Sequence, residues 1–188
     1  MVPDVPTFPA RLPEFAREGF IEDVEFAKLL GAIEEKGLRT MVLCAYRLGF
    51  RKAELQNLLV VQVKADGRVS LFKGATKNSR GRDVKMPADV RAAVEECCAG
   101  KQPDDYVFTW ANGDRILDFR ASWKKATTKI KRPELLFHDL RRSTVRRMRK
   151  LGVPTAVGMK ITGHLTRKVF DDYDATNDAD LADAAEII

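Results

Sequence analysis

Apolar side chains recur with helical spacing through the first part of the chain. One helix face is formed by residues three or four positions apart: Phe26, Leu29, Leu30 and Ile33. Gly37 is expected to end this first helix, and a second, more apolar helix is expected over 38–48. A short third helix is predicted over 52–58. Arg51 therefore stands at the start of a helix, on a scaffold that the apolar pattern predicts to be buried.

Three β-type runs occupy the middle of the chain. They are rich in β-branched and alternating apolar residues and cover Leu59–Lys64, Arg68–Lys73 and Arg82–Met86. A turn at Ala65-Asp66-Gly67 joins the first two runs. The link between the last two, residues 74–81, is rich in turn-forming and basic residues, so we expect an exposed hairpin tip. The pattern predicts one small three-stranded antiparallel sheet.

The remaining elements are predicted to be helices, which makes the fold α+β and mostly α-helical. Helical periodicity covers 88–99, 117–130, 139–151 and 154–161, and a short acidic helix is expected from about residue 178. Prolines at positions 3, 6, 9 and 13 instead indicate an extended linker or arm. We therefore divide the chain into an arm over 1–20, one domain over 21–176 and an acidic C-terminal tail helix over 177–188.

The composition is that of a single soluble globular domain. Its 188 residues suit one domain with a full core, and its 45% hydrophobic and 32% charged residues are typical of such proteins. No apolar run reaches the roughly 18 residues that span a bilayer, and the first residues lack the features of a signal peptide. A cytoplasmic protein without membrane contact is therefore expected. The three cysteines show no Cys-x-x-Cys spacing, which argues against a disulfide framework and a zinc site.

Positive charge is concentrated in the body of the chain. Seven of the 27 acidic residues and none of the 33 basic residues follow Phe170, so residues 1–170 carry 20 acidic residues and a net charge of +13. Basic residues crowd two stretches, 120–132 and 141–150. Solvated helix faces would explain either stretch alone, but two of them favour a phosphate backbone as the partner. The candidate DNA-binding residues are Arg120, Lys124, Lys125 and Arg142.

The only two histidines of the chain stand in short motifs ahead of one tyrosine. His138 and Arg141 are three positions apart on a predicted helix, so one side chain can move a proton while the other grips phosphate oxygens. His164 follows a glycine, and Tyr173 comes nine positions later. Because a phenol has a pKa of about 10, Tyr173 needs a nearby base or cation to attack at neutral pH. With Arg51, these groups are what metal-free phosphoryl transfer through a phosphotyrosine requires.

Each motif has a simpler explanation when it is taken alone. Arg51 and Glu54 would form a surface ion pair, and a lone His-x-x-Arg commonly marks a capped helix start. A histidine at a helix junction, or a tyrosine near the end of a chain, usually serves packing. The carboxylates that flank Tyr173 also oppose its approach to a phosphate. In our functional interpretation, Glu54 instead orients the guanidinium of Arg51.

The ordered set of motifs resembles the tyrosine recombinases, the phage integrase family. The set runs from about residue 22 to residue 173 and comprises Arg51 within Gly-x-Arg-x-x-Glu-Leu, Lys77 within Thr-Lys-Asn, His138-x-x-Arg141, Gly163-His164 and Tyr173. The connecting stretch 136–142 also resembles integrases of bacterial prophages or genomic islands. The resemblance implies a metal-independent enzyme without a cofactor, whose catalytic domain covers 21–176.

The resemblance also implies a role for each matching residue. Arg51 and Arg141 would clamp the scissile phosphate, and His164 would donate a further hydrogen bond to it. His138 would act in proton transfer at Tyr173.

A lysine would protonate the departing 5′ oxygen. Lys77 is favoured by its place at the hairpin tip and by the Thr-Lys-Asn context, and Lys73 and Lys85 are its rivals.

The implied activity is that of a site-specific DNA recombinase, or integrase, which cleaves and rejoins double-stranded DNA through a 3′-phosphotyrosine intermediate. Such an enzyme would act as a homo-oligomer, a tetramer, on DNA. The alternatives are a type IB topoisomerase, which shares the chemistry, and a non-catalytic DNA-binding module on the same scaffold. Family members usually carry a separate helical DNA-binding domain ahead of the catalytic one. We therefore expect the catalytic part of a longer protein, or a natural remnant.

Overall fold

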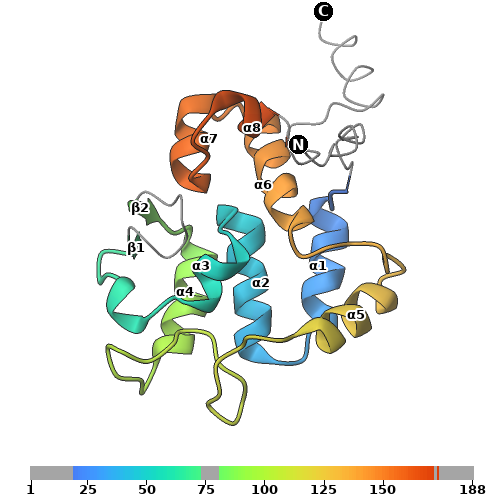
Figure 1. Ribbon diagram of the computed structural model, residues 1–188. Coiled ribbons are helices and arrows are strands. Elements are labelled where there is room, and N and C mark those ends of the chain that lie inside the picture. The colour runs from blue at the N-terminus through green and yellow to red at the C-terminus, as the bar shows by residue number, and fades with distance from the viewer. Residues whose placement is uncertain (1–18, 73–80, 172, 174–188) are drawn as a thin grey trace, which may run out of the picture.

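Helix α2 (Lys36–Leu48) lies at the centre of the fold, and the other elements pack around it. Nine of its 13 residues are buried, so it presents no wide face to solvent. Four helices contact it directly: α1 (Asp23–Ala32), α3 (Lys52–Gln56), α4 (Ala88–Cys98) and α6 (Asp139–Lys150) (Figure 1). The position of α3, which begins next to Arg51, is therefore set by the most buried helix of the molecule.

The computed structural model describes residues 19–72, 81–171 and 173. Helix α5 (Arg120–Lys129) packs on α1. Helix α7 (Thr155–Thr162) contacts α6, the following helix α8 (Arg167–Asp171) and the small sheet (Figure 1). No helix within these ranges is long and apolar enough to cross a membrane. The end of α7 thus lies where α6 and the sheet approach each other.

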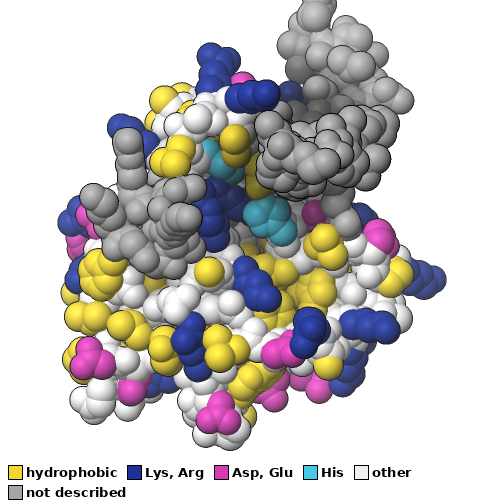
Figure 2. Space-filling view, viewed as in Figure 1, with side chains coloured by type: hydrophobic (Ala, Val, Ile, Leu, Met, Phe, Trp, Pro, Cys, Tyr) yellow, Lys and Arg dark blue, Asp and Glu magenta, His cyan; other side chains and the backbone are white. Residues whose placement is uncertain are grey.

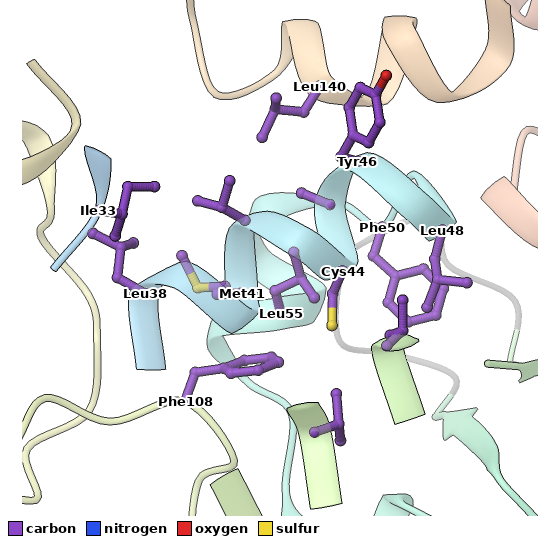
Figure 3. Packing of buried hydrophobic residues seen from close by; sticks show 14 of the residues in the cluster. Ile33, Leu38, Met41, Cys44, Tyr46, Leu48, Phe50, Leu55, Phe108 and Leu140 are labelled. Carbon is purple, nitrogen blue, oxygen red and sulfur yellow. The ribbon is translucent and has the colours of Figure 1, made fainter. Parts of the chain in front are cut away.

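An aromatic contact joins the first two helices. The rings of Phe26 in α1 and Tyr46 in α2 stack with their centroids 3.7 Å apart, and the Tyr46 hydroxyl donates a hydrogen bond to Asp23 Oδ1 at 2.8 Å. Figure 3 shows Tyr46 beside Leu140 of α6, with Phe108 on the opposite side of α2. The polar tip of Tyr46 thus has a partner while its ring lies in the core.

Among the described residues the sheet has two strands, not the three that the sequence predicted. Strand β1 (Arg68–Leu71) pairs with β2 (Arg82–Lys85) in antiparallel fashion. The run that was expected to form the first strand instead contains a 3₁₀ helix at Val60–Gln62. It meets the sheet through one isolated bridge, between Val63 and Val69.

The backbone amides of this run explain the missing strand. Val60 and Val61 donate to the carbonyls of Asp105 and Pro103, which belong to the loop after α4. The buried Gln62 side chain accepts from a neighbouring amide at 2.9 Å and donates to a carbonyl of β1 at 2.8 Å. Because these groups are already paired, the run cannot form a continuous ladder with β1.

Two helix starts also differ from the expectation. Gly37 lies in the first turn of α2 rather than ending α1. A Cβ there would come within 2.1 Å of the Thr109 carbonyl oxygen, so only glycine permits this backbone contact. Helix α5 begins at Arg120 because the Asp118 side chain accepts a hydrogen bond from the Arg120 amide at 3.0 Å and holds the preceding residues in a turn.

The sequence did not predict α8. Residues 1–18 of the expected arm and the expected tail helix lie outside the described residues.

A buried leucine and an exposed one provide a matched test of this core. Leu29 in α1 is 0% exposed, and Leu151 after α6 is 65% exposed. Leu29→Ala should lower the free energy of unfolding by about 2–5 kcal/mol, because it removes buried methyl groups and leaves a cavity. Leu151→Ala should change it by less than about 0.5 kcal/mol. Urea denaturation followed by circular dichroism measures both, and equal losses would contradict the burial of Leu29.

Candidate active site

Three arginines from separate elements converge on the C-terminal end of α7. Arg51 precedes α3, Arg82 begins β2, and Arg141 lies in α6. Each donates to one of three consecutive carbonyls: Arg82 Nε to Ile161 at 3.0 Å, Arg141 Nη1 to Thr162, and Arg51 Nη2 to Gly163 at 2.8 Å. Because the carbonyl end of a helix carries partial negative charge, it stabilises these cations close together.

Glu54 is shared by two of these arginines. Its Oε1 accepts from Arg82 Nη1 at 2.9 Å and from Arg51 Nη1 at 3.1 Å, and its Oε2 accepts from Arg82 Nη2 and the Arg51 amide at 2.9 and 2.8 Å. Burial alone would raise the pKa of Glu54, but the hydrogen bond and charge of Arg82, followed by those of Arg51, hold it below its usual value. Glu54 is therefore ionised, and the three guanidiniums still outnumber it.

Arg141 has hydrogen-bonding capacity to spare. It is 2% exposed, and its Nη1 donates to the carbonyls of Gly49 and Thr162. Its Nη2 has no hydrogen-bond partner among the described residues. Burial, followed by the charge of Arg51, pulls the pKa of Arg141 below its usual value, yet a guanidinium stays protonated at neutral pH. A buried guanidinium with an unused N–H group suits an anion such as a phosphate.

His138 and Tyr173 meet at the exposed side of the site. His138 Nε2 lies 2.6 Å from Tyr173 Oη. His138 occupies the N-cap position of α6, but its side chain makes no capping hydrogen bond, which leaves the ring available to the tyrosine. Removal of water around the ring, and then the charges of Arg141 and Arg142, lower the pKa of His138. His138 is therefore neutral near pH 7 and suited to accept the phenol proton.

Cationic and aromatic groups surround the Tyr173 ring. The His164 ring centroid lies 4.9 Å from that of Tyr173, and the guanidinium carbons of Arg142 and Arg141 lie 5.4 and 5.9 Å from it. The two guanidinium distances are within the range of cation–π contact. Figure 2 shows the two histidines on one face of the molecule with Lys and Arg side chains between them. A phenol with a base at its hydroxyl and cations nearby has the surroundings of a tyrosine nucleophile.

Thr162 holds His164 in place. Its Oγ1 lies 2.7 Å from His164 Nδ1 and 2.8 Å from the Gly158 carbonyl, and it can donate to only one of them. The direction of this hydroxyl therefore decides which nitrogen of His164 carries the proton. His164 is 7% exposed, and its Nε2 has no partner within the described part of the chain. Burial, followed by the charges of Arg141 and Arg51, lowers the pKa of His164 to about 3.

A cavity of about 460 Å³ adjoins these groups, between β2 and α7. Arg51, Arg82 and His164 contribute to its walls. The Arg51 side chain is 32% exposed, whereas that of Arg82 is 10% exposed. The cavity therefore gives a ligand access to Arg51 and His164, while Arg82 remains mostly covered.

The candidate general acid is not part of the described site. Lys77 and its rival Lys73 lie outside the described residues. The other rival, Lys85, donates to the backbone carbonyl of Asp66. Lys85 is thus occupied with a turn of the sheet rather than with the three arginines.

The four candidate DNA-binding residues lie in two different parts of the structure. Arg120, Lys124 and Lys125 lie on α5 and are exposed, and α5 packs on α1. Arg120 and Lys125 are each paired with a carboxylate, at 2.6 and 2.9 Å. Arg142 instead lies over the Tyr173 ring in the site, and its Nε and Nη1 have no partner among the described residues.

Sequence reasoning did not identify Arg82 as part of the site. The alternation of side chains along a strand places it on the same face as Val84, which is buried. An arginine on the core face of a strand needs a buried anion or carbonyl as its partner. An arginine at a buried strand position was therefore the sequence signal that could have identified Arg82.

Comparison with known proteins gives three findings. Residues 20–179 match the phage integrase family. No curated protein sequence matches the chain. The third finding is a set of similar solved structures. The crystal structure of XerA recombinase has 18% sequence identity and a TM-score of 0.75, with coverage of 89% of this chain and 64% of that one.

Two integrase structures are similar as well. The Tn1549 transposon integrase in complex with a circular intermediate DNA has 14% identity and a TM-score of 0.71, and the match covers 93% of this chain and 67% of that one. The catalytic domain of bacteriophage HP1 integrase has 19% identity and a TM-score of 0.65, with coverage of 89% and 94%. The chain thus spans less than two thirds of the XerA recombinase but nearly all of the HP1 catalytic domain.

The two histidines allow a direct test of the electrostatics, because they are the only ones in the chain. Proton and nitrogen-15 NMR of the imidazole rings should show His164 still neutral at pH 5, since its pKa is about 3. His138 should also titrate below its ordinary value of about 6.5. A His138→Gln variant assigns the signals. An imidazole of His164 that is protonated at pH 6 would contradict its desolvated position.

The lowered pKa of His164 also makes the free energy of unfolding depend on pH. The unfolded chain binds a proton at His164 near pH 6.5, whereas the folded chain does not until about pH 3, so acidification within this window favours unfolding. The free energy of unfolding should fall with pH, with a slope of up to about 1.4 kcal/mol per pH unit from this residue. Urea unfolding between pH 7 and 5 should show a shallower slope for His164→Asn than for the wild type.

Proposed function

Since the chain belongs to the phage integrase family, we propose that it is a site-specific DNA recombinase that cuts and rejoins strands through a 3′-phosphotyrosine intermediate. The predicted fold is confirmed: it is mostly helical with a small antiparallel sheet, and it is shared with the XerA recombinase and the HP1 integrase catalytic domain. One observation carries the proposed activity. His138 Nε2 lies 2.6 Å from Tyr173 Oη, beside an arginine with an unused N–H group.

The first chemical step would join Tyr173 to the scissile phosphate. Tyr173 Oη attacks the phosphorus while its proton passes to His138 Nε2, and the bond between phosphorus and the 5′ oxygen breaks. The 5′ oxygen leaves with a proton from Lys77. In the reverse step, the 5′-hydroxyl of a second strand attacks the phosphotyrosine and returns a proton to Lys77. His138 then returns its proton to the departing phenolate.

The arginines would act on the non-bridging oxygens of the same phosphate. Arg51 reaches the cavity, and Arg141 offers its unused Nη2, so both can stabilise the negative charge that grows in the transition state. His164 would add a donor through Nε2 when the Thr162 hydroxyl donates to Nδ1. Charge stabilisation and proton transfer thus concern different oxygens of the phosphate.

Double-stranded DNA is the proposed substrate. The Tn1549 integrase structure contains a circular intermediate DNA, and residues 1–170 of this chain carry a net charge of +13. Arg120, Lys124 and Lys125 remain candidates for contacts with the DNA backbone. On the family resemblance we further propose a tetramer on DNA and action in the cytoplasm.

Covalent attachment tests the nucleophile. On a nicked duplex that contains the target site, the wild-type protein should form a protein–DNA adduct that is visible on a denaturing gel. Tyr173→Phe should form none, because it lacks the attacking oxygen, while its affinity for DNA should change less than about threefold.

Tyr106→Phe is a matched control, because Tyr106 lies in the loop after α4, away from Tyr173. The Tyr106→Phe variant should form the adduct as the wild type does. An undiminished adduct in Tyr173→Phe would end the assignment. Strand exchange between two sites distinguishes a recombinase from a topoisomerase, which would only relax a supercoiled plasmid.

The role of Lys77 can be separated from that of the arginines by changing the leaving group. Lys77→Ala should be slow on ordinary DNA, because the 5′ oxygen needs a proton to leave. It should recover to near the wild-type rate when that bridging oxygen is replaced by sulfur, a leaving group that needs no proton. Arg51→Ala and Arg141→Ala should not recover, because they act on the non-bridging oxygens.

Single-turnover cleavage of both substrates measures these rates. Lys85→Ala is the control, and it should be close to wild type on either substrate because Lys85 is bonded to Asp66. Rescue of Lys85→Ala or Lys73→Ala, with Lys77→Ala remaining slow on both, would assign the acid to another lysine.

A further inference from the structure

Arg82 is mostly buried in the site, and each nitrogen of its guanidinium already has a hydrogen-bond partner within the protein. Its side chain is 10% exposed, and its three nitrogens are all used, two by Glu54 at 2.9 Å and one by the Ile161 carbonyl at 3.0 Å. Its guanidinium carbon also lies 5.2 Å from the centroid of the Phe50 ring. Arg51, by contrast, is 32% exposed and reaches the cavity. Any contribution of Arg82 to the chemistry therefore acts through its neighbours.

Those neighbours are the groups that would hold the phosphate. Glu54 Oε1 accepts from both Arg82 and Arg51, so two hydrogen bonds join their guanidiniums, and through Ile161 Arg82 holds the end of α7 two residues before Gly163. Arg51 itself donates to the Gly163 carbonyl, next to His164. Arg82 thus contacts Glu54, which also binds Arg51, and Ile161, which lies two residues before the carbonyl that accepts from Arg51.

We propose that Arg82 is a positioning residue, which fixes the guanidinium of Arg51 and the turn that carries His164 for phosphate binding. The catalytic part of this inference rests on the proposed recombinase function. Each oxygen of Glu54 accepts one hydrogen bond from Arg82 and one from Arg51. Without Arg82, each oxygen of Glu54 loses one hydrogen bond, so the carboxylate can turn further toward the Arg51 guanidinium and draw that guanidinium away from the phosphate.

The planar fork of arginine is needed for this role. One guanidinium spans both oxygens of Glu54 and directs its third nitrogen to Ile161, whereas a lysine ammonium is a single point of charge. Arg82→Lys should therefore fail to replace it although the charge is kept. This outcome separates a geometric role from a purely electrostatic one.

The kinetic test compares Arg82→Met with a matched change on the neighbouring strand. Arg68 in β1 is 54% exposed and pairs with Asp66 at 2.6 Å, so Arg68→Met removes an arginine and its ion pair from the same sheet. Single-turnover cleavage by Arg82→Met and Arg82→Lys should slow by about 100-fold, the cost of a small misplacement at the reacting centre. DNA affinity should change less than about threefold. Arg68→Met should cleave as the wild type does.

The double variant Arg51→Ala, Arg82→Met shows whether the effect passes through Arg51. If Arg82 positions Arg51, its loss should cost less than about fivefold when Arg51 is already absent, because only the contribution through the His164 turn remains. If the rate loss of the double variant instead equals the product of the two single losses, the proposal is overturned. Urea unfolding of each variant shows whether it is folded. If Arg82→Met does not fold, the same comparison with Arg82→Lys decides whether the effect passes through Arg51.

An NMR measurement tests the positioning without any reaction. The His164 ring nitrogen signals should shift in Arg82→Met and Arg82→Lys, and they should stay unchanged in Arg68→Met. Unchanged His164 signals in both Arg82 variants would overturn the positioning role, whatever the activity. Absence of a Tyr173 adduct in the wild type, together with shifted His164 signals, would refute the recombinase function and leave the positioning role supported.

Discussion

The site depends on one electrostatic arrangement, in which three guanidiniums are gathered at one helix end. Arg51, Arg82 and Arg141 repel one another, and they stay together because the last carbonyls of α7 and the carboxylate of Glu54 accept their hydrogen bonds. The elements that deliver them pack on α2 or α7, so the core of the protein determines where the charges meet. Among the described residues the charge of this cluster is not balanced, since Glu54 is the one carboxylate bonded to any of its three guanidiniums. A phosphodiester, with its single negative charge, is an anion that this imbalance favours.

Burial, followed by the same excess of positive charge, lowers the pKa of both histidines. His138 and His164 are both neutral near pH 7 in the free protein, because both are partly stripped of water and lie beside the arginines. His138 is thus prepared as a base at the tyrosine hydroxyl. His164 is prepared as a neutral ring whose proton position depends on the Thr162 hydroxyl. Arrival of an anion would relieve the repulsion, so binding and proton transfer are linked through charge.

Much of this arrangement could be predicted from the sequence, because the signals were local. Apolar periodicity indicated the helices that carry the site, and the pair His138 and Arg141 share a helix face by spacing alone. The parts that could not be predicted depend on contacts between distant segments. The expected first strand pairs its amides with the loop after α4, and Arg82 has its partners 28 and 79 positions away. Lys125 is paired with Glu34, 91 positions earlier, so a run of basic residues was a poor guide to free charge.

The order of the site residues along the chain has a consequence for folding. The arginine before α3 and the carboxylate within it come early, while the accepting carbonyls at 161–163 and the tyrosine at 173 come more than a hundred residues later. During synthesis, the first two guanidiniums and their carboxylate would leave the ribosome well before the helix end that completes their hydrogen bonds. A partly made chain would therefore hold neither the assembled arginine cluster nor the tyrosine that contacts His138. In the recombinase that we propose, this order would postpone the capacity to cut DNA until nearly the whole domain has been made.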